Sequence, residues 1–173
     1  MGTRKMMWIL FVLIATSAWF FGSAIEAGAE TLNYKVYTWV IKQENTPIGD
    51  VEEHNVFSFV RGAFVVFENG EVATSYGMGI GEVAKSSFSF IQYKTWTFSD
   101  GSTMIIKTSQ GAVEATALGG AGGWKSEIIK GTGRFEGIKG TESIRIKYLP
   151  LEKWEAGVKG YGDGSITYTL PSK

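Results

Sequence analysis

Three cations lie on otherwise apolar or aromatic faces of predicted strands: Arg61, Lys94 and Lys107. If these faces line the interior of a barrel, that interior is apolar with a cationic centre, which suits an amphiphilic anion such as a fatty or aromatic acid. The alternative is that the cations lie on the outer face, because a buried charge is costly unless it is paired. On the first interpretation, the candidate ligand-binding residues are Arg61, Tyr76, Tyr93, Lys94, Trp96 and Lys107.

Two residues are candidates for proton transfer in such a site. His54 is the only histidine, and imidazole has the side-chain pKa best suited to acid–base catalysis near neutral pH. Glu114 is a candidate counter-ion for Lys107 on the same predicted strand. Because the two residues are an odd number of positions apart, both side chains face inward only if a bulge intervenes. Glu52 and Glu53 adjoin His54, but neighbouring strand residues point to opposite faces, so no metal site is expected. We also expect no cofactor.

These residues fall on segments where apolar and polar residues alternate between turn signals, as in β-strands. The predicted strands are Tyr34–Lys42, Asn55–Phe67, Val72–Ile80, Ser87–Phe98, Thr103–Thr116, Trp124–Lys130, Thr141–Leu149 and Ser165–Leu170. Gln43–Asp50, Leu118–Gly123 and Glu152–Gly164 are predicted loops because of their glycine, proline and polar residues. The pattern predicts an all-β fold, an antiparallel barrel of about eight strands whose interior is packed or holds one small ligand.

Small residues form one face of the strand that follows the Asn69-Gly70 turn. Ala73, Ser75, Gly77 and Gly79 alternate there with larger side chains. Such a face suits either a crowded barrel wall or a close contact between subunits.

Glycines punctuate the segment Ile128–Gly140 and leave Phe135 as its one large apolar anchor. This pattern predicts a strand end, a tight bulged turn and the start of the next strand, with Phe135 in the core. A dinucleotide-binding loop requires a helix after the glycines, whereas the segment from Thr141 alternates like a strand. A nucleotide site is therefore not expected here.

The same segment, Gly131-Thr132-Gly133-Arg134-Phe135-Glu136-Gly137-Ile138-Lys139-Gly140, resembles the signature of the allene oxide cyclase and dirigent-protein superfamily and of its bacterial members of unknown function. The resemblance implies an eight-stranded barrel with a lumen, a small and largely apolar ligand, and a homotrimer. It also implies an acidic side chain in the first strand, used for cyclisation of a fatty-acid epoxide or for steering of phenoxy radicals. Thr38 occupies that position here, and Tyr34–Lys42 contains no carboxylate. No catalytic residue is therefore carried over.

Residues 1–29 are predicted to be a secretory signal peptide. Arg4 and Lys5 precede a long apolar run, and Ala27-Gly28-Ala29 supplies the small residues of a cleavage site. The competing interpretation is a retained anchor, because the uncharged run is about long enough to span a bilayer. We expect a periplasmic or secreted protein with one β-barrel domain, 30–173, which contacts a membrane only through an uncleaved signal segment.

The charge and cysteine content exclude several classes of function. Seventeen basic and seventeen acidic residues give no net charge, so nucleic acid is not an expected partner. The absence of cysteine rules out a thiol nucleophile, a thiolate metal site and disulfides.

Three hypotheses for function remain open. The first is an exported barrel that binds a small hydrophobic molecule, fatty-acid-like or aromatic, in its lumen and isomerises, cyclises or stereochemically steers it by confinement. The second is a non-catalytic carrier of a lipid or aromatic compound. The third is a structural or interaction barrel with a packed lumen. The resemblance favours the first, and a filled lumen would exclude the first two.

Overall fold

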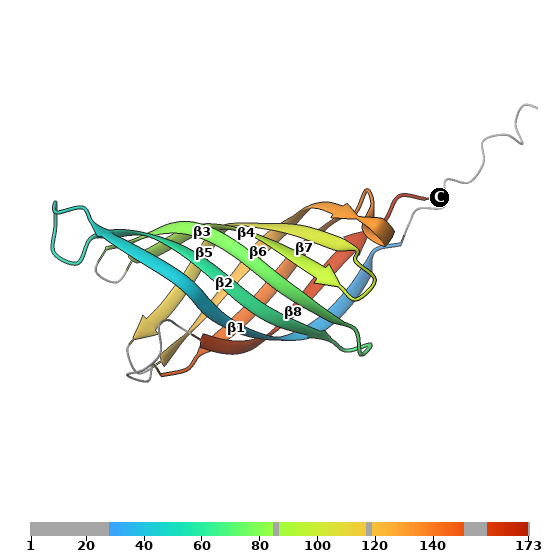
Figure 1. The fold of residues 1–173 in the computed structure, drawn as a ribbon, viewed down its shortest axis with the longest axis horizontal. Helices are drawn as coiled ribbons and strands as arrows, with labels where there is room; N and C mark the ends of the chain where they lie inside the picture. The colour runs from blue at the N-terminus through green and yellow to red at the C-terminus, as the bar shows by residue number, and fades with distance from the viewer. Residues whose placement is uncertain (1–27, 85–86, 117–118, 151–158, 173) are drawn as a thin grey trace, which may run out of the picture.

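The chain forms a closed antiparallel barrel in which each strand pairs with the next and β8 pairs with β1 (Figure 1). The computed structural model describes residues 28–84, 87–116, 119–150 and 159–172, without the side chains of 87, 110–116 and 119. The strands are β1 (Glu30–Pro47), β2 (Asn55–Phe67), β3 (Val72–Ala84), β4 (Ser87–Phe98), β5 (Thr103–Thr116), β6 (Gly119–Thr132), β7 (Lys139–Tyr148) and β8 (Lys159–Thr169). The predicted all-β, eight-stranded antiparallel barrel is confirmed.

Most of the predicted signal peptide, residues 1–27, lies outside the described part of the chain. Within the described ranges, no helix is long and apolar enough to cross a membrane.

Strict alternation decides which side chains enter the barrel. On β1 the inward residues are Tyr34, Val36, Thr38 and Val40, and on β7 they are Glu142, Ile144, Ile146 and Tyr148. Side chains from all eight strands meet in one core, in which Trp96, Met104, Ile106 and Ile166 are fully buried. An eight-stranded barrel has an interior that such side chains just fill.

The structure has longer strands than predicted at β1, β3, β6, β7 and β8, and part of each of the three predicted loops is strand. β6 begins at Gly119 rather than Trp124, β8 begins at Lys159 rather than Ser165, and β1 continues to Pro47 rather than Lys42. The glycines of β8 are inward positions rather than turn positions. The backbone hydrogen bonds of the barrel therefore override the loop signal of a glycine-rich sequence.

The small side chains of β3 point into the barrel and are not available for a contact between subunits. Ala73, Ser75, Gly77 and Gly79 are buried or half-buried, and the larger side chains between them are exposed. A Cβ at Gly79 would lie 2.6 Å from Cζ of Phe59. The glycines thus leave room for aromatic rings of β2, so the crowded-wall alternative is the correct one.

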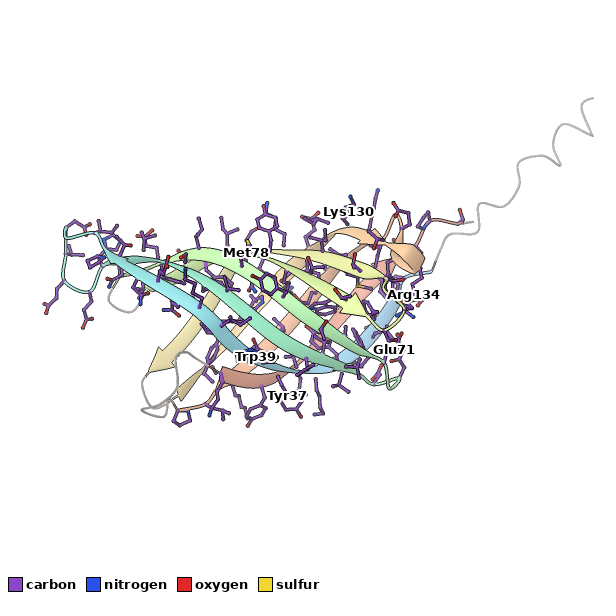
Figure 2. All side chains as sticks on the ribbon, in the orientation of Figure 1. Tyr37, Trp39, Glu71, Met78, Lys130 and Arg134 are labelled. Atoms are coloured by element: carbon purple, nitrogen blue, oxygen red, sulfur yellow. The ribbon has the colours of Figure 1, made fainter. Side chains whose placement is uncertain are left out.

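One end of the barrel is closed by the glycine-rich corner that follows β6. A short helical turn, η1 (Gly133–Phe135), inserts Phe135 against Phe98 at a centroid distance of 4.8 Å. Gly133 and Gly137 have φ of 63° and 75°, the left-handed region that favours glycine. Arg134 covers Phe98 and Phe135 and pairs with Glu71 (Figure 2). The predicted turn with Phe135 as core anchor is confirmed.

The opposite end of the barrel carries the long β1–β2 hairpin, at the left of Figure 1. The register of these strands shifts between Val40 and Lys42, so Ile41 forms a β-bulge opposite the Val60–Arg61 step. A bulge reverses the alternation beyond it. As a result, Gln43 and Asn45 line the same cavity as Val40.

Candidate ligand site inside the barrel

The carboxylate of Glu142 on β7 is buried at the centre of the barrel and binds residues from two other strands. Lys94 Nζ of β4 donates to Oε1 at 2.6 Å and to Oε2 at 2.8 Å. The hydroxyl of Tyr34 on β1 donates to Oε1 at 2.6 Å. Glu142 is 1% exposed and Lys94 is 8% exposed, so the ion pair is removed from water. Charge-assisted hydrogen bonds of this kind are the strong ones.

Within this cluster, the positive charge of Lys94 and the negative charge of Glu142 balance each other. Burial raises the pKa of Tyr34 well above its usual value, and the negative charge and hydrogen bond of Glu142 add to the rise. Tyr34 therefore remains a neutral donor. Lys94 also lies 5.3 Å from the centroid of Trp96, whose ring meets that of Tyr34 edge to face. The cluster joins three strands and offers no unpaired charge to a ligand.

Arg61 on β2 occupies the same rung of the barrel as Lys94. Arg61 pairs with Gly77 of β3, and Gly77 pairs with Lys94. Among the described residues, no carboxylate pairs with Arg61, and its buried Nε has no hydrogen-bond partner. Its recorded contact is with the Phe59 ring, 5.3 Å from the guanidinium carbon to the centroid. An unpaired buried donor on a cation is costly and therefore marks a place where a ligand is expected.

Arg61 lies at the inner end of a cavity in the open mouth of the barrel. The cavity has a volume of about 260 Å³. Its lining residues are Val40, Gln43, Asn45, Phe57, Phe59, Arg61, Val83, Phe88, Phe90 and Tyr148. Most of these side chains are aromatic or aliphatic, with a few polar groups among them, which is the usual composition of a small-molecule site.

Beyond Arg61 the interior is almost full. A second cavity of about 30 Å³ lies between Arg61, Lys94 and Trp124. At about 30 Å³ for each water molecule, that volume holds one. The indole Nε1 of Trp124 lies there without a hydrogen-bond partner among the described residues. A ligand therefore has room in the mouth and not at the centre.

The structure divides the six predicted ligand-binding residues into two groups. Arg61, Lys94 and Trp96 face the interior. Tyr76 and Tyr93 are 53% and 46% exposed on the outer face. Lys107 lies beside Tyr93 on that face, 5.8 Å from its ring centroid. These three residues occupy outward positions of their strands, whereas Lys94 occupies an inward position. They therefore cannot line an interior site.

The first candidate for proton transfer, His54, is not among the described residues that line the mouth cavity. His54 lies between Asp50 and Glu82, with Nδ1 2.6 Å from Asp50 and Nε2 2.8 Å from Glu82. Both carboxylates raise the pKa of His54, Asp50 more than Glu82. The side chain of Glu114 lies outside the described part of the chain.

Sequence reasoning missed the central residue of the interior, Glu142. The signal was present, because Glu142 lies at the same alternate positions of the predicted strand Thr141–Leu149 as the apolar residues Ile144, Ile146 and Tyr148. A carboxylate on an inward face requires a buried cation, and Lys94 was already a candidate. The two observations together would have identified the pair.

Dirigent proteins are among the solved structures with the same fold. The chain matches the pterocarpan synthase dirigent protein GePTS1 with a TM-score of 0.52 and 14% identity, over 84% of this chain and 92% of that one. It matches the pterocarpan synthase dirigent protein PsPTS1 with a TM-score of 0.50 and 13% identity, over 84% and 97%. No family model and no curated protein matches the sequence. At such identities the likeness shows the fold alone.

Proposed function

We propose that the protein binds a small, largely apolar molecule in the mouth cavity and fixes its orientation, as a steering protein does. The observation that carries the proposal is the aromatic cavity of about 260 Å³ with Arg61 at its inner end. The dirigent-like fold supports it, because two of the solved structures that share the fold are named as pterocarpan synthases. The packed centre limits the occupant to the mouth.

The chemistry of the lining favours confinement over acid–base catalysis. No carboxylate or imidazole is among the described residues that line the cavity. Glu142, the interior acid, is bound to Lys94 and Tyr34, and the hydroxyl of Thr38 donates to the carbonyl of Gly62. Among the described residues, cyclisation driven by an acid therefore has no free group at the cavity, whereas holding a reactive molecule in one geometry needs only shape and a few donors.

A filled-cavity variant tests the proposal. Val83 lines the cavity, so Val83→Phe reduces its volume, whereas Val56→Phe adds the same atoms to the outer face of β2. Native mass spectrometry of the protein purified gently from its own host is expected to show a co-purifying small molecule. That mass should persist in Val56→Phe and be lost in Val83→Phe. An unchanged ligand in Val83→Phe would contradict the proposal.

Product analysis separates steering from transport. If the protein steers a reaction, the bound compound or its reactive precursor gives a different isomer ratio with the native protein than with Val83→Phe. If the ratio is the same and the compound is only retained, the protein is a carrier. Chiral chromatography of the products measures the ratio.

We also propose that the protein is exported and that the signal segment is removed. The support is the basic start, apolar run and Ala27-Gly28-Ala29 site in the sequence. The intact mass of the protein from its own host tests this: a chain that starts at Glu30 supports export with cleavage, and a full-length chain contradicts cleavage.

The outer face of β1–β4 supports a further proposal, a homo-oligomer, which by resemblance is a trimer. Tyr37 and Trp39 of β1 and Met78 of β3 point away from the barrel (Figure 2). The large apolar residues exposed on these strands are Tyr37, Trp39, Ile41, Val56, Phe64, Val66, Val72, Tyr76, Met78, Ile80, Ile91 and Tyr93. Monomeric proteins rarely expose an apolar patch of this extent, so a second copy is the expected cover.

A further inference from the structure

The two interior cations of the barrel differ in one respect. Lys94 has a buried carboxylate partner in Glu142, and Arg61 on the same rung has none among the described residues. Three of the described carboxylates of β1–β3 and the β1–β2 hairpin are paired with other cations: Glu82 and Asp50 with His54, and Glu44 with Lys42. The barrel thus neutralises one cation internally and leaves the other facing a cavity.

We infer that Arg61 is the anchor for the carboxylate of a small monocarboxylate whose apolar body fills the mouth. This inference rests on the proposed function, because it names the class of molecule that the cavity takes. A guanidinium suits a carboxylate because its parallel N–H groups donate to both oxygens. Removing the ion pair from water, as the aromatic walls do here, strengthens the attraction.

The backbone near Arg61 places further polar side chains where the carboxylate of the ligand is expected. The bulge at Ile41 lies directly opposite Arg61, and it turns Gln43 and Asn45 toward the cavity. Their amides hydrogen-bond to one another, with Gln43 Nε2 3.1 Å from Asn45 Oδ1. Bulges are often found beside functional sites, where they redirect side chains. The cavity is thus polar at Arg61 and along one edge of β1, and apolar elsewhere.

The dimensions define the body of the ligand. Arg61 and the outermost aromatic residue of β2, Phe57, are four residues apart, which is about 13 Å along a strand. A volume of about 260 Å³ equals that of about nine water molecules at about 30 Å³ each. The expected ligand therefore has about ten non-hydrogen atoms, the size of octanoate or cinnamate.

Matched acids and amides test the inference directly. Cinnamate and octanoate are compared with cinnamamide and octanamide, which have the same shape and no charge. Calorimetric titration of the wild type should show each acid binding about tenfold to 100-fold more tightly than its amide, the range for hydrogen bonds to charged groups. The preference should disappear below about pH 4, because the acids protonate there and arginine does not.

Variants at position 61 identify the anchor. Arg61→Met should weaken acid binding by about tenfold or more and leave amide binding unchanged. Arg61→Lys should recover only part of the affinity, because an ammonium group keeps the charge and lacks the parallel N–H groups. Lys107→Met removes a cation from the outer face and should change neither. If Arg61→Met fails to fold, Arg61→Lys and the acid-to-amide ratio of the wild type remain decisive.

The possible outcomes separate the inference from the proposed function. Acid binding that exceeds amide binding only while Arg61 is present supports both. Equal binding of acid and amide, or an Arg61→Met variant that keeps the preference, overturns the carboxylate anchor and leaves the cavity as a site for neutral molecules. No binding of any of the four probes, together with no co-purifying ligand, overturns both.

Discussion

Lys94 and Glu142 form an ion pair inside the barrel between strands that are not neighbours, β4 and β7, and both oxygens of the carboxylate are used. Tyr34 adds a third strand to the same carboxylate. Hydrogen bonds between adjacent strands close the barrel, whereas this contact crosses its interior. It therefore ties the two sides of the wall together at the level of the candidate site.

Breaking this pair from one side should be strongly destabilising. Glu142→Gln keeps the shape and leaves Lys94 charged without a buried partner, for which the expected cost is about 3–5 kcal/mol. Urea denaturation followed by tryptophan fluorescence measures the change in the free energy of unfolding. Glu127→Gln on the outer face of β6 is the matched control and should change stability by less than about 0.5 kcal/mol.

The double variant shows whether the cost comes from the unpaired charge. Lys94→Met combined with Glu142→Leu replaces the pair by apolar side chains, and it should be more stable than Glu142→Gln alone. If the single and double variants are equally destabilised, packing at these positions is responsible rather than charge.

Tyr34→Phe should lose the hydrogen bond to Glu142 and keep the ring contacts with Phe67 and Trp96. The expected loss is about 1.5–3 kcal/mol, because the acceptor is charged. The raised pKa of Tyr34 gives a second observable. Its neutral form is favoured in the folded state, so this contribution is present below the ordinary value of 10.0 and is lost as the pH rises above it. Alkaline titration of phenolate absorbance should show fewer groups titrating near pH 10 in the native wild type than in the unfolded chain, because the pKa of Tyr34 is raised and that of Tyr168 is raised to about 12.

The sequence was sufficient for the fold and only partly sufficient for the site. Alternation defined the strands and placed Arg61, Lys94 and Trp96 on one side of the wall. It did not decide the side for Tyr76 and Tyr93, because β1–β4 have apolar residues on both faces and the usual contrast between faces is missing. Lys107 of β5 has the same alternation as the apolar residue Ile105, which suggested an inward face.

Glycine was the other source of error. At inward positions of β8, Gly160 leaves space for the side chains of Ile146 and Tyr148, and Gly164 leaves space for that of Tyr34. A Cβ at Gly162 would meet the neighbouring backbone of β7. In the sequence, glycines at alternate positions are indistinguishable from a flexible loop. Only the pairing of both flanking strands shows that they are part of the wall.

The contact between His54 and Asp50 should make stability depend on pH in a defined window. The pKa of His54 is raised above 6.5, so its contribution is fully present below that pH and is lost as the pH rises through the folded-state pKa. The pKa of Asp50 is lowered from 3.8, so its contribution is present above that value and is lost on further acidification. The contact therefore stabilises most between about pH 4 and about pH 6.5.

The single histidine makes this prediction simple to check by NMR. The imidazole of His54 should titrate above pH 6.5 in the folded protein, and Asp50→Asn should lower its pKa. His54→Gln should lower the free energy of unfolding at about pH 5.5 more than at about pH 9. An equal effect at both values would mean that the contact depends on shape and not on charge.

Gly79→Ala should destabilise the barrel at the mouth. An added Cβ would lie 2.6 Å from the Phe59 ring and 2.5 Å from the carbonyl oxygen of Ile91, and the latter is backbone and cannot turn aside. Overpacking of this kind costs about 1–3 kcal/mol. Gly123→Ala is the control, because its nearest neighbour would be 3.4 Å away. Thermal unfolding of the two variants should therefore differ by several degrees, with Gly79→Ala lower.

The exposed face of β1–β4 predicts how the oligomer can be broken. Met78 is 53% exposed at the middle of that face, so Met78→Glu should leave the barrel folded and place a charge inside a contact between copies. Sedimentation velocity should show an oligomer for the wild type and a shift toward monomer for Met78→Glu. Thr141→Glu on the polar outer face of β7 is the matched control and should leave the mass unchanged. A wild type that sediments as a monomer at every concentration would contradict the proposed assembly, and the apolar face would then need a different partner.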